Sequence, residues 1–311
     1  MRPLFGYHLP SYSFAGVEPE GLFNRVASVA QRAESIGFDL ITVMDHFYQI
    51  SGVGPEEAPM LEAYSTLAGI AARTSRVRLG ALVSGVTYRN PALLAKTVTT
   101  LDIISGGRAI LGLGAAWNES EHRGYGFDFP PIGERMNRLD EALTICHRMF
   151  TEERPSFEGR YYRIDAALNS PRPVQPGGPR IIVGGGGEQR TLRLVARHAD
   201  YAHWFPLGME VLRHKSELLE RYCEEIGRDP ATVTKTMAAP VLLVPDAHSA
   251  ELRLAQIPPE RRGSIVPATP AQAAEIIAEY VEAGFGGFTF NNSMLPEESL
   301  DLAAELFRLL D

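Results

Sequence analysis

Short runs of apolar residues recur along the chain, and within most of them the hydrophobic positions are continuous rather than alternating with polar ones. Strands that are covered on both faces show this pattern, because neither face meets water. Such strands are typical of parallel sheets. The runs predict eight strands, at Leu4–Leu9, Asp39–Asp45, Val77–Gly85, Arg108–Gly114, Arg180–Gly186, Asp200–Phe205, Ala239–Pro245 and Gly287–Asn292.

Helical patterns fill the segments between these runs. In Glu134–Phe150 the apolar residues recur at spacings of three and four, which places them along one face of a helix. Pro91 suits the first turn of a helix, because proline lacks the N–H that this turn leaves unbonded. The other predicted helices are Glu18–Ile36, Glu62–Arg73, Pro91–Ile104, Thr191–Ala199, Val211–Ile226, Pro270–Ala283 and Leu300–Leu310.

Eight strands that alternate with helices over 311 residues predict an α/β fold, a TIM (β/α)8 barrel with insertion segments, as one domain over residues 1–311. The alternative is a doubly wound open sheet, which usually has fewer strands and a glycine-rich turn after the first one. Here the segment PSYSFAG follows the first strand. The Pro- and Gly-rich segment Thr151–Pro179 is expected to hold a small hairpin. The long connection Asp246–Thr269 is a candidate lid.

Composition narrows the functional classes. The formal net charge of −8 argues against wholesale binding to nucleic acid or to an anionic membrane. No apolar run approaches the roughly 20 residues that span a bilayer, and the first residues lack the apolar stretch and cleavage site of an export signal. Cys146 and Cys223 lie in helical patterns without a C-x-x-C partner. We therefore expect reduced thiols in a cytoplasmic protein.

The function of a barrel lies where its strands end, so the residues there are candidates. Asp45 and His46 close the second strand. An imidazole titrates near neutral pH and can pass a proton to a substrate, while an acidic neighbour tunes its charge and orientation. The alternative is a histidine held by hydrogen bonds in a polar loop. At a strand end of a barrel we favour the catalytic interpretation.

Small residues end the third and fourth strands. Ser84 and Gly85 are small enough for a flat ring to approach the backbone, although a simple turn explains the pair equally well. Gly112 and Gly114 have the spacing of a dinucleotide fingerprint, but Trp117 stands where the third glycine belongs. No acidic residue ends a second strand about 20 positions later. The dinucleotide interpretation is therefore poor.

The segment after the fourth strand has the pattern of a capped helix. Asn118 and Glu121 have the spacing of a capping box, which accounts for both residues without any function. His122, Arg123 and Tyr125 then offer hydrogen-bond donors near a helix start, where anions are favoured. The fifth strand leads into Gly184, Gly185, Gly186 and Gly187, followed by Glu188, Gln189, Arg190 and a helix.

This tetraglycine turn, Gly184–Gly187, is a candidate phosphate site. Exposed backbone N–H groups at a helix start, with Arg190 beside them, can hold an anion. It is not a Walker A loop, because no Gly-Lys-Ser/Thr follows. A flexible loop is the alternative, but four glycines make a loop at a high entropic cost. The eight histidines show no paired metal spacing, and there is no G-x-S-x-G elbow. His198 and His203 lie on either side of the sixth strand's start, where a structural role is as compatible with the sequence as a functional one.

The motifs together resemble the luciferase-like monooxygenase family, and in particular its members that use the deazaflavin coenzyme F420. The resemblance is carried by ITVMDHF, by the block from VRLGALVSGVTYRNP to GERMNRLDEAL, and by PRIIVGGGGEQRTLRLVARHADYAHW. It runs from about Leu4 to Asn291. It implies a TIM barrel with a deazaflavin or flavin in the barrel mouth, and a homodimer.

The resemblance also implies roles for individual residues. Asp45 and His46 would lie beside the ring, with His46 as the proton donor or acceptor, and a non-proline cis peptide near Ser84–Gly85 would buttress one face. Leu113, Gly114 and Ala115 would line the ring or the ribityl chain. The phosphate end would be held by Arg123, Tyr125, Gly185, Gly186, Gly187 and Arg190.

Three functions follow from the resemblance. The first is hydride transfer between the C5 atom of F420 and a small organic substrate. The second is FMN-dependent oxygenation with reduced flavin and O2, and the third is flavin binding without catalysis. Retention of Asp45 and His46 argues against the third. The loops Tyr48–Met60 and Asp246–Thr269 would set the substrate, and their composition suggests a modest apolar organic molecule.

Overall fold

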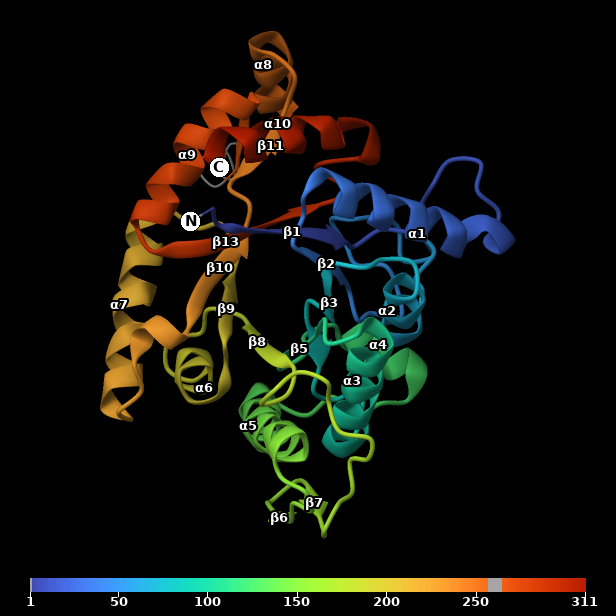
Figure 1. Ribbon diagram of the computed structural model, residues 1–311, viewed down its shortest axis with the longest axis vertical. Coiled ribbons are helices and arrows are strands. Elements are labelled where there is room, and N and C mark those ends of the chain that lie inside the picture. Colours follow the sequence, from blue (N-terminus) through green and yellow to red (C-terminus); the bar gives the residue numbers. More distant parts are fainter. Residues whose placement is uncertain (1, 257–264) are drawn as a thin grey trace.

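The computed structural model describes residues 2–256 and 265–311, and it shows eight parallel strands arranged around a closed ring (Figure 1). The sheet order is β3-β2-β1-β13-β10-β9-β8-β5, and β3 pairs with β5 to close it. The predicted TIM barrel is confirmed. The barrel strands are β1 Leu4–Leu9, β2 Leu40–Val43, β3 Arg78–Ala81 with its continuation β4 Ser84–Gly85, β5 Ala109–Gly114, β8 Arg180–Gly184, β9 Tyr201–Trp204, β10 Thr234–Ala238 and β13 Phe285–Asn291.

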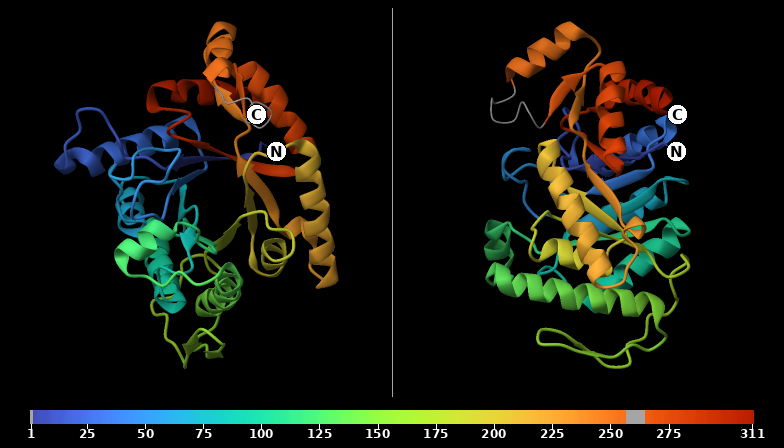
Figure 2. Two further views of the ribbon diagram at one scale, coloured as in Figure 1. Left: turned by 180° about the vertical axis from the view of Figure 1, so that it is seen from behind. Right: turned by 90° about the vertical axis from the view of Figure 1, so that its left-hand side faces the viewer.

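Helices pack around the outside of the strands, as the three views together show (Figures 1 and 2). The apolar face predicted for Glu134–Phe150 is confirmed, because Met136, Leu139, Leu143, Cys146 and Phe150 are all buried. Among the described residues, no helix has the length and apolar character that crossing a membrane requires. In the described ranges the α-helices are α1 Pro19–Ile36, α2 Ala63–Ala71, α3 Pro91–Ser105, α4 Glu119–Tyr125, α5 Ile132–Thr151, α6 Thr191–His198, α7 Met209–Glu225, α8 Ala247–Gln256, α9 Pro270–Glu282 and α10 Leu300–Leu310, and 3₁₀ turns lie at Pro230–Thr232 and Glu297–Ser299.

The expected hairpin in Thr151–Pro179 is present. Strands β6, Phe157–Glu158, and β7, Arg163–Ile164, pair antiparallel. Their turn docks on α5, because the Glu141 carboxylate accepts backbone N–H groups of Arg160, Tyr161 and Tyr162 at 2.8–3.0 Å. The hairpin lies next to α5 at the lower edge of Figure 1.

The seventh barrel strand was predicted in the wrong place. The apolar run Ala239–Pro245 contains β11, Val241–Leu243, which pairs with β12, Val266–Ala268, in a separate two-stranded sheet. The barrel position is taken by β10, whose sequence TKTMA is largely polar. The candidate lid Asp246–Thr269 contains α8 and β12, and its residues 257–264 lie outside the described residues.

The buried face of α7 also differs from the prediction. Of the apolar positions expected on one face, Leu218 and Tyr222 are buried, but Val211 and Ile226 are exposed. Leu212 and Leu219 are buried in their place. The true face carries a charged residue, because Lys215 is three residues after Leu212 and four before Leu219. The helix therefore brings an ammonium group to the side that packs on the barrel.

Candidate active site

His46 and Glu121 form a close pair at the carboxyl ends of the strands. His46 follows β2, and Glu121 lies in α4, which follows β5. The His46 Nδ1 atom is 2.6 Å from Glu121 Oε1, and Glu121 Oε2 accepts the backbone N–H of Phe47 at 2.7 Å. The hydroxyl of Tyr88 donates to the same carboxylate. The capping-box interpretation of Glu121 is thus wrong, and Asn118 makes no side-chain cap to the helix backbone.

The hydrogen bonds of this pair assign the proton on His46. Burial raises the pKa of Glu121, but the bonds from His46 and Tyr88 outweigh it and hold the pKa below its usual value. An ionised carboxylate only accepts hydrogen bonds, so Nδ1 of His46 carries the hydrogen. The other ring nitrogen, Nε2, is then the atom that can exchange a proton. The side chain of His46 keeps 13% of its surface exposed, whereas that of Glu121 keeps none.

Asp45 has a different partner from the one expected. Its carboxylate faces Arg89, which donates to both oxygens at 2.6 and 3.1 Å, rather than His46. Arg89 also donates to Glu62 at 2.6 Å and lies over the ring of Tyr64. Burial raises the pKa of Asp45, and the charge of Arg89 opposes that rise. The acid that orients His46 is Glu121, and Asp45 belongs to a buried ion pair beside it.

This ion pair is connected to the end of the third strand. Ser84 is fully buried, and its hydroxyl shares a hydrogen bond of 2.7 Å with the hydroxyl of Tyr64. The non-proline cis peptide expected near Ser84–Gly85 lies at Leu82–Val83. The side chain of Val83 leaves no room for a Cβ at Gly114, which would come within 2.8 Å of it. Glycine at this strand end is therefore required by packing against Val83.

Three residues of α4 were expected to offer hydrogen-bond donors, and they differ in how far they are exposed. His122 is fully buried, and both ring nitrogens are engaged at 2.6 Å, Nδ1 with the carbonyl of Asn118 and Nε2 with the hydroxyl of Thr87. It therefore has a structural role and offers no donor to an anion. Arg123 is exposed, and Tyr125 is half exposed with its ring stacked on Phe47 at 4.5 Å.

The tetraglycine turn connects β8 to α6. The N–H of Gly185 donates to the carbonyl of His203 at 3.1 Å. Within the described part of the chain, the N–H groups of Gly186 and Gly187 have no protein acceptor. Arg190, expected beside an anion, instead donates to the carbonyl of Gly133 and to the side chain of Asn137 in α5. Two open amides are what this turn can offer to an anion.

Aromatic and imidazole groups complete the strand ends. Trp117 follows β5, is 58% exposed, and its ring centre is 5.5 Å from that of His46. Phe205 follows β9 and is 78% exposed. Burial lowers the pKa of His8 to about 3 and that of His203 to about 4, so both rings are neutral near pH 7. The strand ends thus combine exposed apolar rings with hydrogen-bonding groups, as small-molecule sites do.

The sequence profile of the family described as luciferase-like monooxygenase matches residues 4–258. The chain belongs to this family. The expected resemblance is confirmed, and the protein is an oxidoreductase of the luciferase-like monooxygenase fold.

Two relatives and one solved structure resemble the chain. It is 32% identical over 303 residues to an F420-dependent glucose-6-phosphate dehydrogenase of Kineococcus radiotolerans, with 86% of each chain covered. It is 42% identical over 171 residues to the protein of the same name from Intrasporangium calvum, which covers 54% of this chain and 48% of that one. The chain thus spans about half the length of the second relative.

The solved structure is an F420-dependent secondary alcohol dehydrogenase in complex with an F420-acetone adduct. It superposes with a TM-score of 0.82 at 20% identity and covers all of both chains. At that identity the likeness shows the fold.

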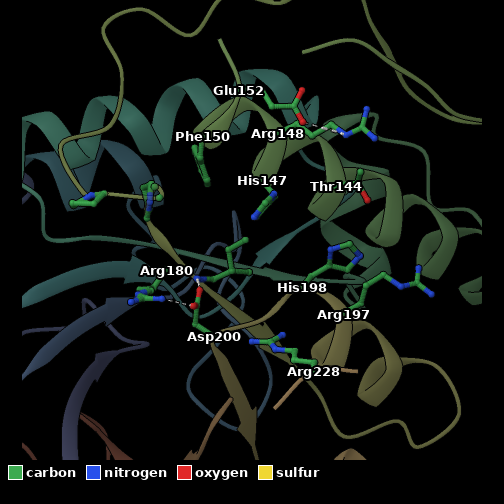
Figure 3. Close-up of a pocket in the computed structure, with 15 residues that line it drawn as sticks. Thr144, His147, Arg148, Phe150, Glu152, Arg180, Arg197, His198, Asp200 and Arg228 are labelled. Atoms are coloured by element: carbon green, nitrogen blue, oxygen red, sulfur yellow. Dashed lines mark hydrogen bonds and ion pairs between the residues drawn. The ribbon is translucent and has the colours of Figure 1, made fainter. Parts of the chain in front are cut away.

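A cavity of about 450 Å³ lies at the opposite end of the barrel, where β8 begins (Figure 3). Its wall carries four arginines, but they are committed to other groups. Arg228 donates to the carbonyls of Ala196 and Ala199, and Arg180 to the carboxylate of Asp200. In TIM-barrel enzymes the active site lies at the carboxyl ends of the strands. We therefore place the candidate site at the His46 end.

Sequence reasoning missed several residues of this luciferase-like site. Glu121 was assigned to a cap and Trp117 to a broken fingerprint, and Arg89 and Lys215 were not singled out. Lys215 carried the clearest signal, because the spacing from Leu212 puts a charge on an apolar stripe. Glu121 carried none, since its partner His46 lies 75 positions away.

Proposed function

We propose that this luciferase-like protein is an F420-dependent oxidoreductase that transfers a hydride between the C5 atom of F420 and a small organic substrate. The observation that carries the proposal is the pair of His46 and Glu121 at the barrel mouth, which holds one ring nitrogen of His46 free for a proton. The names of the two similar dehydrogenases support the choice of F420.

The residues at the mouth fit an anionic, planar cofactor. The open amides of Gly186 and Gly187 would hold its phosphate end, with Gly184, Gly185, Arg123 and Tyr125 around it. Arg190 would first have to leave its partners Gly133 and Asn137 in α5 to join them. Ser84, Gly85, Gly114 and Ala115 would line the ring or the ribityl chain. The side chain of Leu113 is buried in the core, so Leu113 would contribute its backbone. When bound, the deazaflavin supplies or accepts the hydride at C5.

The chain's own residues would supply orientation and a proton. Reduction of a carbonyl adds a hydride to carbon and a proton to oxygen, and the reverse reaction removes both. His46 would donate or accept that proton at Nε2, while Glu121 keeps Nδ1 protonated and fixes the ring. Asp45, through Arg89 and Ser84, would position the strand end beside the ring rather than move a proton. Trp117 and Phe205 would exclude water from the substrate.

Cofactor choice is tested by titrating the purified protein with oxidised F420 and, separately, with FMN, while absorbance and intrinsic fluorescence are followed. F420 should bind and FMN should bind more weakly. Tighter binding of FMN would instead favour the oxygenase, and binding without turnover of any alcohol or carbonyl compound would favour the non-catalytic barrel.

A further inference from the structure

Lys215 is a charged side chain on the buried face of α7, and the proposed chemistry leaves it unused. Only 8% of its surface is exposed. Lysine is almost never buried without a partner, because removing its charge from water is costly. Its Nζ atom donates to the carbonyl of Gly186 at 2.7 Å and to Glu188 Oε1 at 3.0 Å. Both partners belong to the tetraglycine turn or follow directly after it.

The bond to Gly186 fixes the direction of the next amide. A peptide unit is planar and trans, so its C=O and N–H point in opposite directions. Lys215 draws the Gly186 carbonyl toward α7, and the N–H of Gly187 must therefore point away from α7. That N–H is one of the two amides of the turn without a protein acceptor in the described residues. Lys215 thereby determines which side of this peptide an incoming anion would meet.

Glycine makes this control necessary. With Gly186 and Gly187 on either side, no Cβ opposes a rotation of the peptide plane. A rotated plane would present the carbonyl oxygen, which repels an anion, in place of the N–H. The stem of Lys215 also fills the space beside Gly186, where a Cβ would lie 3.5 Å from its Cε.

The second hydrogen bond of Lys215, to Glu188, balances a negative charge beside the turn. Glu188 follows the turn, and the hydrogen bond from Lys215, then its charge, lower the pKa of this carboxyl. An ionised Glu188 beside the turn would repel an anion. The ammonium of Lys215 balances that charge without itself occupying the turn.

We propose that Lys215 is a positioning residue that holds the tetraglycine turn in its anion-binding form by fixing the Gly186–Gly187 peptide. This inference rests on the proposed function, in which the turn holds the phosphate end of the cofactor. The charged side chain that supports the turn is thus Lys215 rather than Arg190, whose guanidinium is bound to α5.

The test compares probes with and without a phosphate group. The full-length Lys215→Met variant is titrated with F420 and with the deazaflavin riboside that lacks the phosphate tail, and the pair FMN and riboflavin serves as a second comparison. We expect Lys215→Met to weaken the phosphate-bearing probes by about tenfold or more, the scale of one charge-assisted hydrogen bond. The phosphate-free probes should bind as they do to the wild type. Lys215→Arg should restore part of the loss.

Glu188→Gln and the double variant Lys215→Met/Glu188→Gln separate the two bonds. If Lys215 fixes the peptide, the double variant stays weak for phosphate-bearing probes. Full recovery in the double variant would show that Lys215 only neutralises Glu188 and would overturn the proposal. Equal losses for both kinds of probe, or no loss, would overturn it as well. If the wild type binds none of the four probes, the proposed function itself fails and this proposal with it.

Discussion

The two ends of the barrel use buried charge in different ways. At the carboxyl ends of the strands, charged side chains face one another, as in His46–Glu121, Arg89–Asp45 and Lys215–Glu188. At the amino ends ion pairs such as Arg180–Asp200 also occur, but Arg108 and Arg228 instead donate to backbone carbonyls where helices end. Helix ends leave carbonyls unbonded, and a guanidinium is well suited to satisfy several at once.

This difference separates chemistry from stability. Carboxylates and histidines change charge with pH, so the carboxyl end responds to protons and to ligands. A guanidinium bonded to carbonyls has no titrating partner and stays charged at all relevant pH values. Arg108 and Arg228 therefore hold the scaffold together at the amino end, whereas at the carboxyl end the pair of His46 and Glu121 offers a change of protonation that chemistry can use. The following predictions test this division, beginning with the largest effect.

His46→Ala should lower turnover with a confirmed substrate by about 100- to 10,000-fold, the range for loss of a general acid or base. The midpoint of thermal unfolding should fall by only a few degrees, because the ring is partly exposed and the buried Glu121 carboxylate keeps its bonds to Tyr88 and Phe47. Steady-state kinetics and thermal unfolding, measured on the same preparation, check both expectations. Unchanged turnover would remove His46 from the proposed mechanism.

Arg108→Met should lower the free energy of unfolding by about 2 to 4 kcal/mol, because buried carbonyls lose their donor. Arg108 donates to the carbonyls of Ala71, Thr74, Val77 and Ser105 and to the Thr74 hydroxyl. Methionine keeps the apolar stem. Urea unfolding measures the loss, and the affinity for F420 should stay at the wild-type value. A weakened affinity with unchanged stability would contradict the assignment of this end.

Glu121→Gln should change how stability depends on pH. The pKa of Glu121 is lower in the folded state than its unfolded value of about 4.3. A lowered pKa stabilises the protein above the unfolded value, and that stability is lost as the pH falls through the folded one. The free energy of unfolding of the wild type should therefore be about 1 to 2 kcal/mol higher than that of the variant at pH 7.

This difference in the free energy of unfolding between the wild type and Glu121→Gln should shrink as the pH falls below about 4.3. Urea unfolding at a series of pH values follows it. A constant gap would mean that Glu121 stabilises the fold through packing rather than through its charge.

The same two regions show what the sequence could predict. Barrel strands with continuous apolar runs, such as β5, were found because both of their faces are covered. β10 was missed because TKTMA is largely polar, while the apolar run Val241–Leu243 pairs with β12 outside the barrel. An apolar run indicates that a strand is buried, but it does not indicate which strand it pairs with.

At the site, local motifs were found and distant partners were not. The adjacent Asp45 and His46 suggested an acid that orients a base, and the acid proved to be Glu121, 75 positions away. The spacing of Asn118 and Glu121 fits a capping box as well as it fits a buried carboxylate. Only the closure of the barrel, which brings the ends of β2 and β5 to the same mouth, distinguishes the two.

The smallest effect is expected at the cavity of Figure 3. His147 lines this cavity and is exposed. His147→Ala should change the free energy of unfolding by no more than about 0.5 kcal/mol, as for an ordinary surface substitution. It should leave turnover and F420 affinity unchanged, which makes it the matched control for His46→Ala. A loss of turnover in His147→Ala would show that the amino end also takes part in the chemistry. The assignment of chemistry to the carboxyl end alone would then be wrong.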